Sequence, residues 1–316
     1  MMRQRISFIP IPGNRRRVMD PITNFYTILD CIKGQEKKTV IVAAADEHDV
    51  LAATIHARRE GLAEFLYVGH ADRIRQVAKD YDVDIRGIEI VNELEPMDAA
   101  QHAIDLIKQG HGQVLMKGNI NTSQILGMVV SDEELKHQFK HPFLSHVTVY
   151  EWGNRLRIFS DAGMNIAPDI AQKKKIALNA LHIAHKLGVA SPRLAFISAV
   201  EKVNTKMQSS VDAAILADMA WNGAIVDGPL AFDGAMFEEA YQIKGAPSSI
   251  EGKADILIFP NIETANVFYK TLAWMLNLHM AGVMAGSAIP FILTSRSDNE
   301  RIKFLSIAIT LYLAEE

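Results

Sequence analysis

Short apolar runs alternate with amphipathic stretches along most of the chain. The first run, TVIVAAA at residues 39–45, is typical of a buried strand, and helical spacing follows from about Glu47 to Arg59 before Gly61. The same alternation then repeats, with strands predicted at 65–68, 88–91 and 113–116 and helices at 71–81, 96–108 and 123–130. Strands that alternate with helices predict an α/β fold with a mostly parallel sheet covered on both faces.

The second half of the chain opens on a different pattern. HVTVYE at 146–151 and the run at 156–159 alternate like the two arms of a hairpin around Gly153 and Asn154. Further strands are then predicted at 193–199 and 255–259, with helices at 168–187, 210–221 and 262–278. Because 316 residues are many for one core, the chain is expected to form two α/β domains.

The last predicted strand, Ile289 to Leu293, ends in the polar stretch TSRSD at residues 294–298. A helix follows, because Ile302, Leu305, Ile309 and Tyr312 recur at helical spacing. Ser297 and Glu300 have the spacing of a capping box, which would begin this helix.

Ligands of open α/β sheets bind at such strand-to-helix junctions. A helix N-terminus favours an anion, and Arg296, beside Ser295, can grip one through two parallel hydrogen bonds. Asp298 can take a proton, or it can be a first-turn acid that suits the helix dipole. Both interpretations of Asp298 remain open at this point.

A second junction rich in small and polar residues follows the strand at 113–116. It comprises Lys117, Gly118, Asn121 and Thr122, and it lacks the order of residues that defines a Walker loop. Glycine lets a ligand approach the backbone, whereas Asn121 or Thr122 can simply cap the next helix.

Composition excludes several classes of function. The net charge of −4 shows no nucleic-acid signature, and Arg15–Arg17 form too short a run for a basic patch, so they are interpreted as a solvated arm. A single cysteine, Cys31, excludes an internal disulfide framework and a thiolate metal cluster. The chain lacks 18 consecutive apolar residues and a signal-peptide core, so a cytoplasmic location is expected. Neither a dinucleotide fingerprint nor a zinc-protease motif is present.

Five motifs in order give the chain a family resemblance. They are MKG with Asn121 and Thr122, FSDAGMN at 159–165, AVEKVN at 199–204, DGPLAFD at 227–233 and LTSRSD at 293–298. Together they resemble the phosphate acetyl/butyryltransferases, and the EKVN and DGPLAFD forms are closer to the butyryl branch.

The resemblance implies the reaction acyl-CoA plus orthophosphate in equilibrium with acyl phosphate plus CoA. It also implies the two-domain fold of isocitrate and isopropylmalate dehydrogenases, with residues 1–147 plus 283–316 in one domain and 148–282 in the other. The active cleft would lie between the domains and a homodimer would be the basic unit. CoA would be a substrate, with no metal and no resident cofactor.

The resemblance further suggests a role for each junction. Arg296 and Ser295, with Thr122, would hold phosphate, and Asp298 would act as the base that deprotonates the CoA thiol. The candidates for substrate binding in the cleft are Lys117, Gly118, Asn121, Thr122, Asp161, Asn165, Glu201 and Lys202.

Two positions depart from the family pattern. The basic aspartate of the acetyl branch would correspond to Ile302, although Asp298 is expected on the same helix face. A basic residue in the helix after the KG motif is replaced by Gly127 and Met128. The alternatives are therefore a phosphate acetyltransferase, a metal- and NAD-dependent decarboxylating dehydrogenase of the same fold, and a lapsed enzyme that binds CoA esters. The dehydrogenase would need clustered aspartates near the last third of the chain, which are absent.

Overall fold

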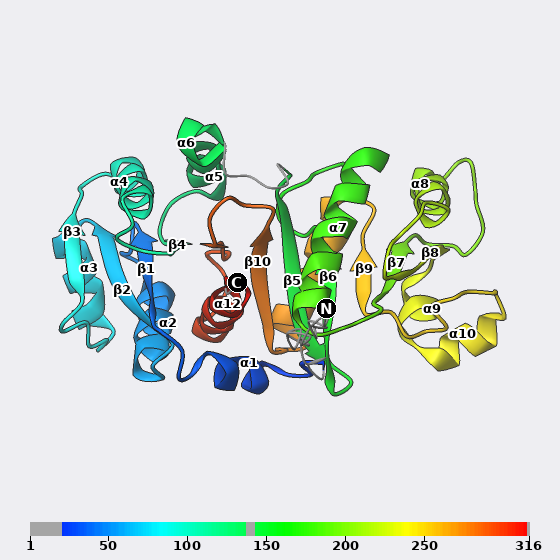
Figure 1. Cartoon of the computed structure of the whole chain (residues 1–316), viewed down its shortest axis with the longest axis horizontal. Coiled ribbons are helices and arrows are strands. Elements are labelled where there is room, and N and C mark those ends of the chain that lie inside the picture. The colour runs from blue at the N-terminus through cyan, green and yellow to red at the C-terminus, as the bar shows by residue number, and fades with distance from the viewer. Residues whose placement is uncertain (1–20, 137–142, 315–316) are drawn as a thin grey trace, which may run out of the picture.

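The structure is a computed structural model that describes residues 21–136 and 143–314. Arg15–Arg17, predicted to form a solvated arm, and part of the predicted connector at 131–141 lie outside the described residues. The described elements form two β-sheets that lie side by side, each with helices packed on both faces (Figure 1). No helix of the described residues is both long and apolar enough to cross a membrane.

The first sheet is parallel throughout, with the strand order β11-β4-β1-β2-β3. Its register sets Val40 opposite both Phe65 and Val114. The strands are β1 (Lys38–Ala43), β2 (Ala63–Gly69), β3 (Glu89–Asn92), β4 (Val114–Lys117) and β11 (Phe291–Ile292). Each of these strands lies close to its predicted position, although β11 is shorter than the apolar run that predicted it.

Alternate residues of β1 belong to two different cores, which is why its buried part, Val40–Ala43, is entirely apolar. Val40 and Val42 pack with α2 and α3, whereas Ile41 and Ala43 pack with α4 and α5. The helices are α2 (His48–Arg59), α3 (Ala71–Asp80), α4 (Pro96–Lys108), α5 (Thr122–Ser131) and α6 (Glu133–Lys136). The predicted α/β class with helices on both faces is therefore confirmed.

The second sheet is mixed, with the strand order β10-β5-β6-β9-β7-β8. The predicted hairpin is present as β5 (Ser145–Trp152) and β6 (Arg155–Ser160), and β10 (Met280–Ala285) extends it in antiparallel fashion. β9 (Ile256–Ile258), β7 (Arg193–Ile197) and β8 (Ile225–Leu230) run parallel to β6. Sequence patterning did not predict β10. Asp227–Pro229, the first residues of the DGPLAFD motif, lie within β8.

Helices of the second sheet end and begin slightly away from their predicted limits. Asp169 caps α7 (Ile170–Lys186) in a reciprocal capping box with Gln172, so Pro168 precedes the helix and is not in its first turn. The helix predicted at 262–278 is α11 (Ile262–Lys270) followed by a π-helical turn, η1 (Thr271–Met275). The other helices are α8 (Gln208–Ala217), α9 (Phe232–Met236) and α10 (Glu238–Lys244).

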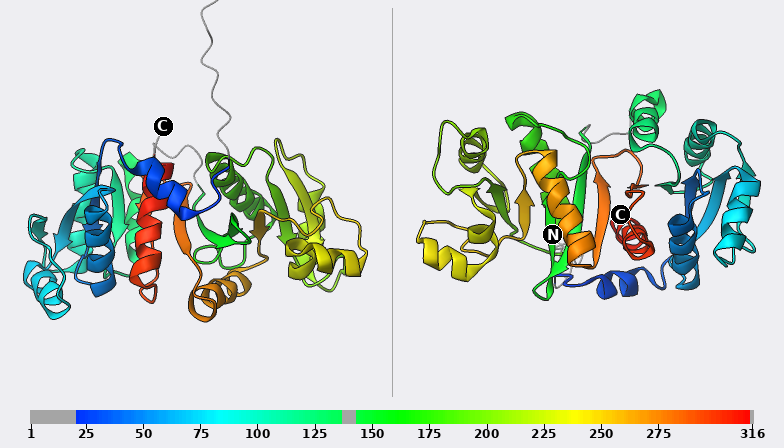
Figure 2. Two further views of the ribbon diagram at one scale, coloured as in Figure 1. Left: turned by 90° about the horizontal axis from the view of Figure 1, so that it is seen from below. Right: turned by 180° about the vertical axis from the view of Figure 1, so that it is seen from behind.

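The last helix, α12 (Glu300–Leu313), lies between the two sheets, and α1 (Phe25–Ile32) crosses beneath it (Figures 1 and 2). Every residue from Ile302 to Leu311 is buried. One continuous apolar core joins Ile307 of α12 to Val40 of the first sheet and Val147 of the second. The domain limits 1–147 plus 283–316 and 148–282 stay a prediction; residue 283 itself lies within β10.

The start of α12 corrects two predictions. Its N-cap is Asn299, whose side-chain oxygen accepts a hydrogen bond from the Ile302 N–H at 3.0 Å, so Ser297 and Glu300 do not form the cap. Asp298 precedes this N-cap. It is therefore neither a first-turn acid nor a residue on the same helix face as Ile302.

Candidate active site

The loop between β11 and α12, residues 294–299, contains a buried carboxylate with two unequal oxygens. Asp298 is only 2% exposed. Its Oδ2 accepts hydrogen bonds from the backbone N–H of Ser295 at 2.7 Å and from the hydroxyl of Tyr269 at 2.8 Å. Its Oδ1 has no hydrogen-bond partner among the described residues, and the nearest cation is the Lys270 ammonium at 3.8 Å. One oxygen is therefore fixed and the other retains its capacity to accept a proton.

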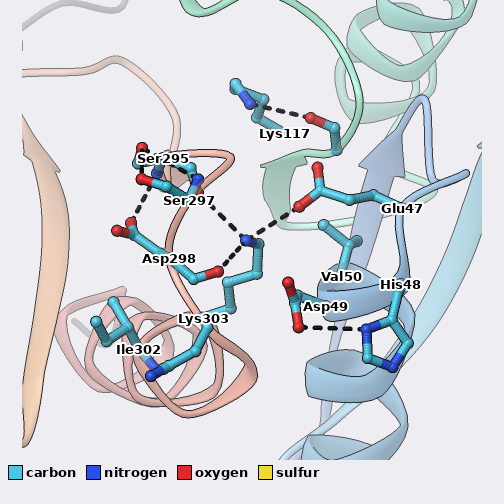
Figure 3. A network of polar contacts seen from close by, with 12 residues as sticks. Glu47, His48, Asp49, Val50, Lys117, Ser295, Ser297, Asp298, Ile302 and Lys303 are labelled. Carbon is cyan, nitrogen blue, oxygen red and sulfur yellow. Dashed lines mark hydrogen bonds and ion pairs between the residues drawn. The ribbon is translucent and has the colours of Figure 1, made fainter. Parts of the chain in front are cut away.

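A buried lysine holds the backbone of the same loop (Figure 3). Lys303 of α12 is 1% exposed, and its ammonium donates to the carbonyl oxygens of Asp298 at 2.6 Å and Ser295 at 3.2 Å. The same ammonium lies 3.0 Å from Oε1 of Glu47, which precedes α2. Sequence analysis singled out neither Lys303 nor Glu47, and a lysine within a helical pattern gives no signal of this kind.

The second sheet reaches the loop through α11. The Lys270 ammonium donates to the hydroxyl oxygens of Ser297 at 3.0 Å and Ser295 at 3.3 Å. Its neighbour Tyr269 supplies the hydrogen bond to Asp298 already described. Residues of α11 were not predicted to belong to the site, and their only sequence signal was a helix that followed a strand.

The two predicted junctions of the first sheet meet in the structure. Arg296 is exposed and donates from NH2 to the side-chain oxygen of Asn121 at 3.2 Å. Asn121 occupies the N-cap position of α5, but its side chain makes no capping hydrogen bond, and Thr122 is the first residue of the helix. The two strand ends therefore form one polar surface, as expected for neighbouring parallel strands.

Lys117 ends β4 as a buried cation without a carboxylate partner among the described residues. Its ammonium donates to the carbonyl oxygen of Gly118 at 3.0 Å. Burial lowers the pKa of Lys117, and the nearby cations Lys303 and Arg296 act in the same direction, whereas Glu47 and Asp298 oppose them. A buried ammonium of this kind is a favourable position for an anion.

Gly118 explains how the chain fits so closely at this point. A Cβ at this position would overlap the backbone carbonyl oxygens of Ala44 and Ala43. The Gly118 N–H instead donates to Ala43 at 2.8 Å, which ties the end of β4 to β1. Glycine is required here because the two backbones are in contact.

Asp161 and Asn165 are engaged with the protein itself. Oδ1 of Asp161 accepts from the backbone N–H groups of Gly163 and Met164, both at 2.9 Å. Its Oδ2 accepts from the Asn165 amide at 2.5 Å and from the backbone N–H of His146 at 3.1 Å. These contacts shape the loop after β6. Substrate binding by either residue stays a prediction.

Glu201 and Lys202 lie over the second sheet, in the connection between β7 and α8. Glu201 forms an ion pair with Lys244 of α10 at 2.7 Å, and Lys244 also contacts Asp233 at 2.5 Å. Lys202 is exposed. Among the described residues, no hydrogen bond or ion pair joins Glu201 or Lys202 to the loop at 294–299, so the structure does not bring them together.

A cavity of about 1010 Å³ opens beside the ends of β7 and β9. The first turns of α7, α8 and α11 line it, with a buried ion pair between Lys173 and Asp212 at 2.6 Å. None of the predicted site residues lines this cavity. It lies at the N-terminal end of α11, whereas Tyr269 and Lys270 lie at the other end of that helix.

Comparison with known proteins shows which family the chain belongs to. The model of the phosphate acetyl/butaryl transferase family matches residues 24–98 and 93–311. This chain belongs to that family. The resemblance found in the five motifs is therefore confirmed, and with it the prediction of an acyltransferase.

Two curated relatives of the chain have different acyl groups in their names. The phosphate butyryltransferase of Clostridium acetobutylicum is 38% identical over 299 residues, which cover 93% of this chain and 99% of that protein. The phosphate acetyltransferase of Thermotoga maritima is 33% identical over 291 residues, covering 91% and 98%.

Solved structures agree with this placement. The branched-chain phosphotransacylase from Enterococcus faecalis V583 superposes with a TM-score of 0.77 at 31% identity, covering 88% of this chain and 99% of that one. The 4-hydroxythreonine-4-phosphate dehydrogenase from Klebsiella pneumoniae, at 13% identity and a TM-score of 0.53, shares the fold alone. The similarity to a dehydrogenase therefore gives no support to dehydrogenase activity.

Proposed function

We propose that this chain transfers a short acyl group, butyryl before acetyl, between CoA and orthophosphate in a reversible reaction. The observation that carries the proposal is the loop at 294–299, where a carboxylate with one unpaired oxygen lies among cations that can hold phosphate. Two relatives named phosphate butyryltransferase are 38% and 39% identical to the chain, against 33% and 35% for two relatives named phosphate acetyltransferase.

Phosphate is proposed to bind between the two strand ends. Arg296 offers a planar pair of donors at the exposed surface, and Lys117 offers a buried ammonium that lacks a carboxylate partner among the described residues. The hydroxyls of Ser295 and Thr122 would complete the site. Charged donors bind a phosphate oxygen about twice as strongly as neutral ones, so Arg296 and Lys117 would dominate the affinity.

The reaction is proposed to pass through one ternary complex, in which positioning lowers the barrier. In the direction of thioester synthesis, Oδ1 of Asp298 takes the proton of the CoA thiol. The thiolate attacks the carbonyl carbon of the acyl phosphate, a carbon–sulfur bond forms and the carbon–oxygen bond to phosphate breaks. Arg296 and Ser295 would stabilise the departing phosphate, which leaves with the electron pair of that bond.

The remaining predictions belong to the same proposal. The cleft would lie between residues 1–147 plus 283–316 and residues 148–282, and the chain would act as a homodimer or a higher homo-oligomer. CoA enters as a substrate in this scheme, with no metal and no resident cofactor. Asp161, Asn165, Glu201 and Lys202 would be further substrate-binding residues of this cleft.

The test is an acyl-chain series from acetyl-CoA to hexanoyl-CoA, with and without phosphate, in which release of the CoA thiol is measured. Phosphate-dependent release that is fastest with butyryl-CoA is the expected result. Fastest release with acetyl-CoA would place the chain in the acetyl branch. Binding of butyryl-CoA without phosphate-stimulated turnover would indicate a lapsed enzyme, and reduction of NAD or NADP by a 2-hydroxy acid would indicate the dehydrogenase.

A further inference from the structure

Tyr269 is a buried phenol whose hydroxyl points at one oxygen of the candidate base. It lies on α11, which packs on the second sheet, whereas Asp298 follows a strand of the first. The hydroxyl donates to Oδ2 at 2.8 Å. Burial, together with the neighbouring Asp298 carboxylate, raises the pKa of Tyr269 well above its ordinary value. The phenol therefore stays protonated and can only act as the donor in this bond.

The two oxygens of Asp298 differ because of this bond. Oδ2 receives two hydrogen bonds, from Tyr269 and from the Ser295 N–H, which fix the plane of the carboxylate. Oδ1 is equally shielded from solvent and receives none. A hydrogen bond to the charged form of a carboxylate favours that form, so the contact acts on protonation as well as on orientation.

We propose that Tyr269 is the positioning residue of Asp298: its hydroxyl holds Oδ2 and stabilises the carboxylate, which leaves Oδ1 as the oxygen that accepts the thiol proton. The inference rests on the proposed role of Asp298 as the general base. Tyr269 itself touches neither substrate in this scheme, and it acts only through the aspartate.

A second buried tyrosine shows that this hydrogen bond is not a consequence of burial alone. Tyr150 of β5 packs in the same aromatic cluster, with its ring centroid 5.7 Å from that of Phe159, and Tyr269 lies 6.5 Å from the same ring. The Tyr150 hydroxyl has no hydrogen-bond partner among the described residues. The chain therefore contains a matched control for the loss of one phenolic hydroxyl.

Several charged or titratable groups face Asp298. Burial lowers the pKa of His146, against the opposing effect of Asp161 and Asp298, so this ring loses its proton more readily than usual. The groups are Tyr269 and Lys270 of α11, Lys303 of α12, His146 of β5, Lys117 of β4, Arg296 of the loop and Glu47 before α2.

The experiment compares the wild-type chain with Tyr269→Phe and Tyr150→Phe. Thioester formation from butyryl phosphate and CoA is followed across the acid range, and kcat/KM for CoA is plotted against pH. Tyr269→Phe is expected to move the acid limb to higher pH, so that activity is lost on that limb and recovers at higher pH. Tyr150→Phe is expected to leave the limb unmoved, and neither variant should change the KM for butyryl phosphate.

The outcomes separate this inference from the proposed function. An unmoved acid limb in Tyr269→Phe, together with an inactive Asp298→Asn, would overturn the positioning role and leave Asp298 as the base. Normal turnover in Asp298→Asn would overturn both the positioning role of Tyr269 and the role of Asp298 as the base. If Tyr269→Phe does not fold, ultraviolet titration of tyrosine in Asp298→Asn gives a second measurement: one phenol should ionise at lower pH than in the wild type, and an unchanged titration contradicts the contact.

Discussion

The ammonium of Lys303 lies 3.0 Å from the Oε1 atom of Glu47, in a part of the molecule where the lysine is 1% exposed. The same ammonium donates to the carbonyl oxygens of Ser295 and Asp298. Most helical lysines extend into solvent, because an unpaired buried charge is costly. Here one side chain joins three elements, namely α12, the loop that precedes it and the residue before α2.

Replacement of Lys303 by methionine is expected to lower the free energy of unfolding by about 3–5 kcal/mol. The change leaves Glu47, whose side chain is 18% exposed, without its partner, and it frees two loop carbonyls. Urea denaturation followed by circular dichroism measures the loss.

Lys33→Met is the matched control for this prediction. Lys33 pairs with Glu60 at 2.7 Å, but the two side chains are 43% and 42% exposed. An exposed ion pair contributes at most about 1 kcal/mol, so this variant should unfold almost as the wild type does. If both lysine variants lost the same free energy of unfolding, the buried ion pair would contribute no more to stability than the exposed one.

Arg296→Ala is expected to raise the KM for phosphate and to lower kcat. A charge-assisted hydrogen bond is worth about 1.5–3 kcal/mol, which corresponds to roughly a 10- to 150-fold loss in kcat/KM for phosphate. Initial rates with butyryl-CoA at varied phosphate measure the effect. Arg75→Ala, which removes an exposed arginine of α3 paired with Asp72, serves as the control. Unchanged phosphate kinetics in the Arg296 variant would remove this residue from the site.

The affinity for phosphate is expected to fall on the alkaline side as Lys117 loses its charge. Burial lowers the pKa of this ammonium from 10.5, so the loss begins at a lower pH than for an exposed lysine. The KM for phosphate, measured between neutral pH and about pH 10, should rise in the wild type. Lys117→Met should show a higher KM at neutral pH and no such rise, and a parallel profile in both proteins would exclude Lys117 from the phosphate site.

The lowered pKa of Lys117 also affects the free energy of unfolding. Stability is expected to rise with pH in the range where the affinity for phosphate falls. Because the folded chain releases this proton at lower pH than the unfolded chain, the unfolded chain binds more protons in the interval below 10.5. The cost of burying the charged Lys117 is present in full at neutral pH and is relieved as the pH rises through that interval.

An added methyl group is expected to have opposite effects on stability at Gly118 and at Gly127. In Gly118→Ala the methyl would collide with the backbone carbonyls of Ala43 and Ala44, so a loss of about 1–3 kcal/mol is expected. In Gly127→Ala, within α5, the methyl meets no atom within 4 Å, and the helix should gain about 0.5–1 kcal/mol. Thermal unfolding of both variants tests the pair, and a stable Gly118 variant would contradict the close backbone contact.

The alternation of strands and helices could be predicted from the sequence wherever a strand is buried between two helix layers. Val40–Ala43 of β1 and Val114–Met116 of β4 are continuous apolar runs for that reason. β10 was not predicted, because MAGVMA follows the helix predicted at 262–278 without a clear stop. The cap of α12 was misassigned to Ser297, since Ser297 and Asn299 both suit a helix start and only the three-dimensional contacts distinguish them.

The site was predictable only in the part that lies on one sheet. Arg296 and Asn121 were both predicted as site residues, and they meet because β11 and β4 are neighbouring parallel strands. Tyr269 and Lys270 could not be predicted, since they come from the other sheet and reach the loop by packing that spacing along the chain does not encode. Glu201 was a candidate because it lies in the AVEKVN motif, and the structure pairs it with Lys244.

Hydrogen bonds from two helices hold the loop at 294–299: Lys303 of α12 donates to it, and so do Tyr269 and Lys270 of α11. The conformation of the loop therefore depends on how both helices pack. The orientation of the Asp298 carboxylate also depends on elements that pack on different sheets, and a substitution that alters how α11 packs would change this carboxylate without touching the loop itself.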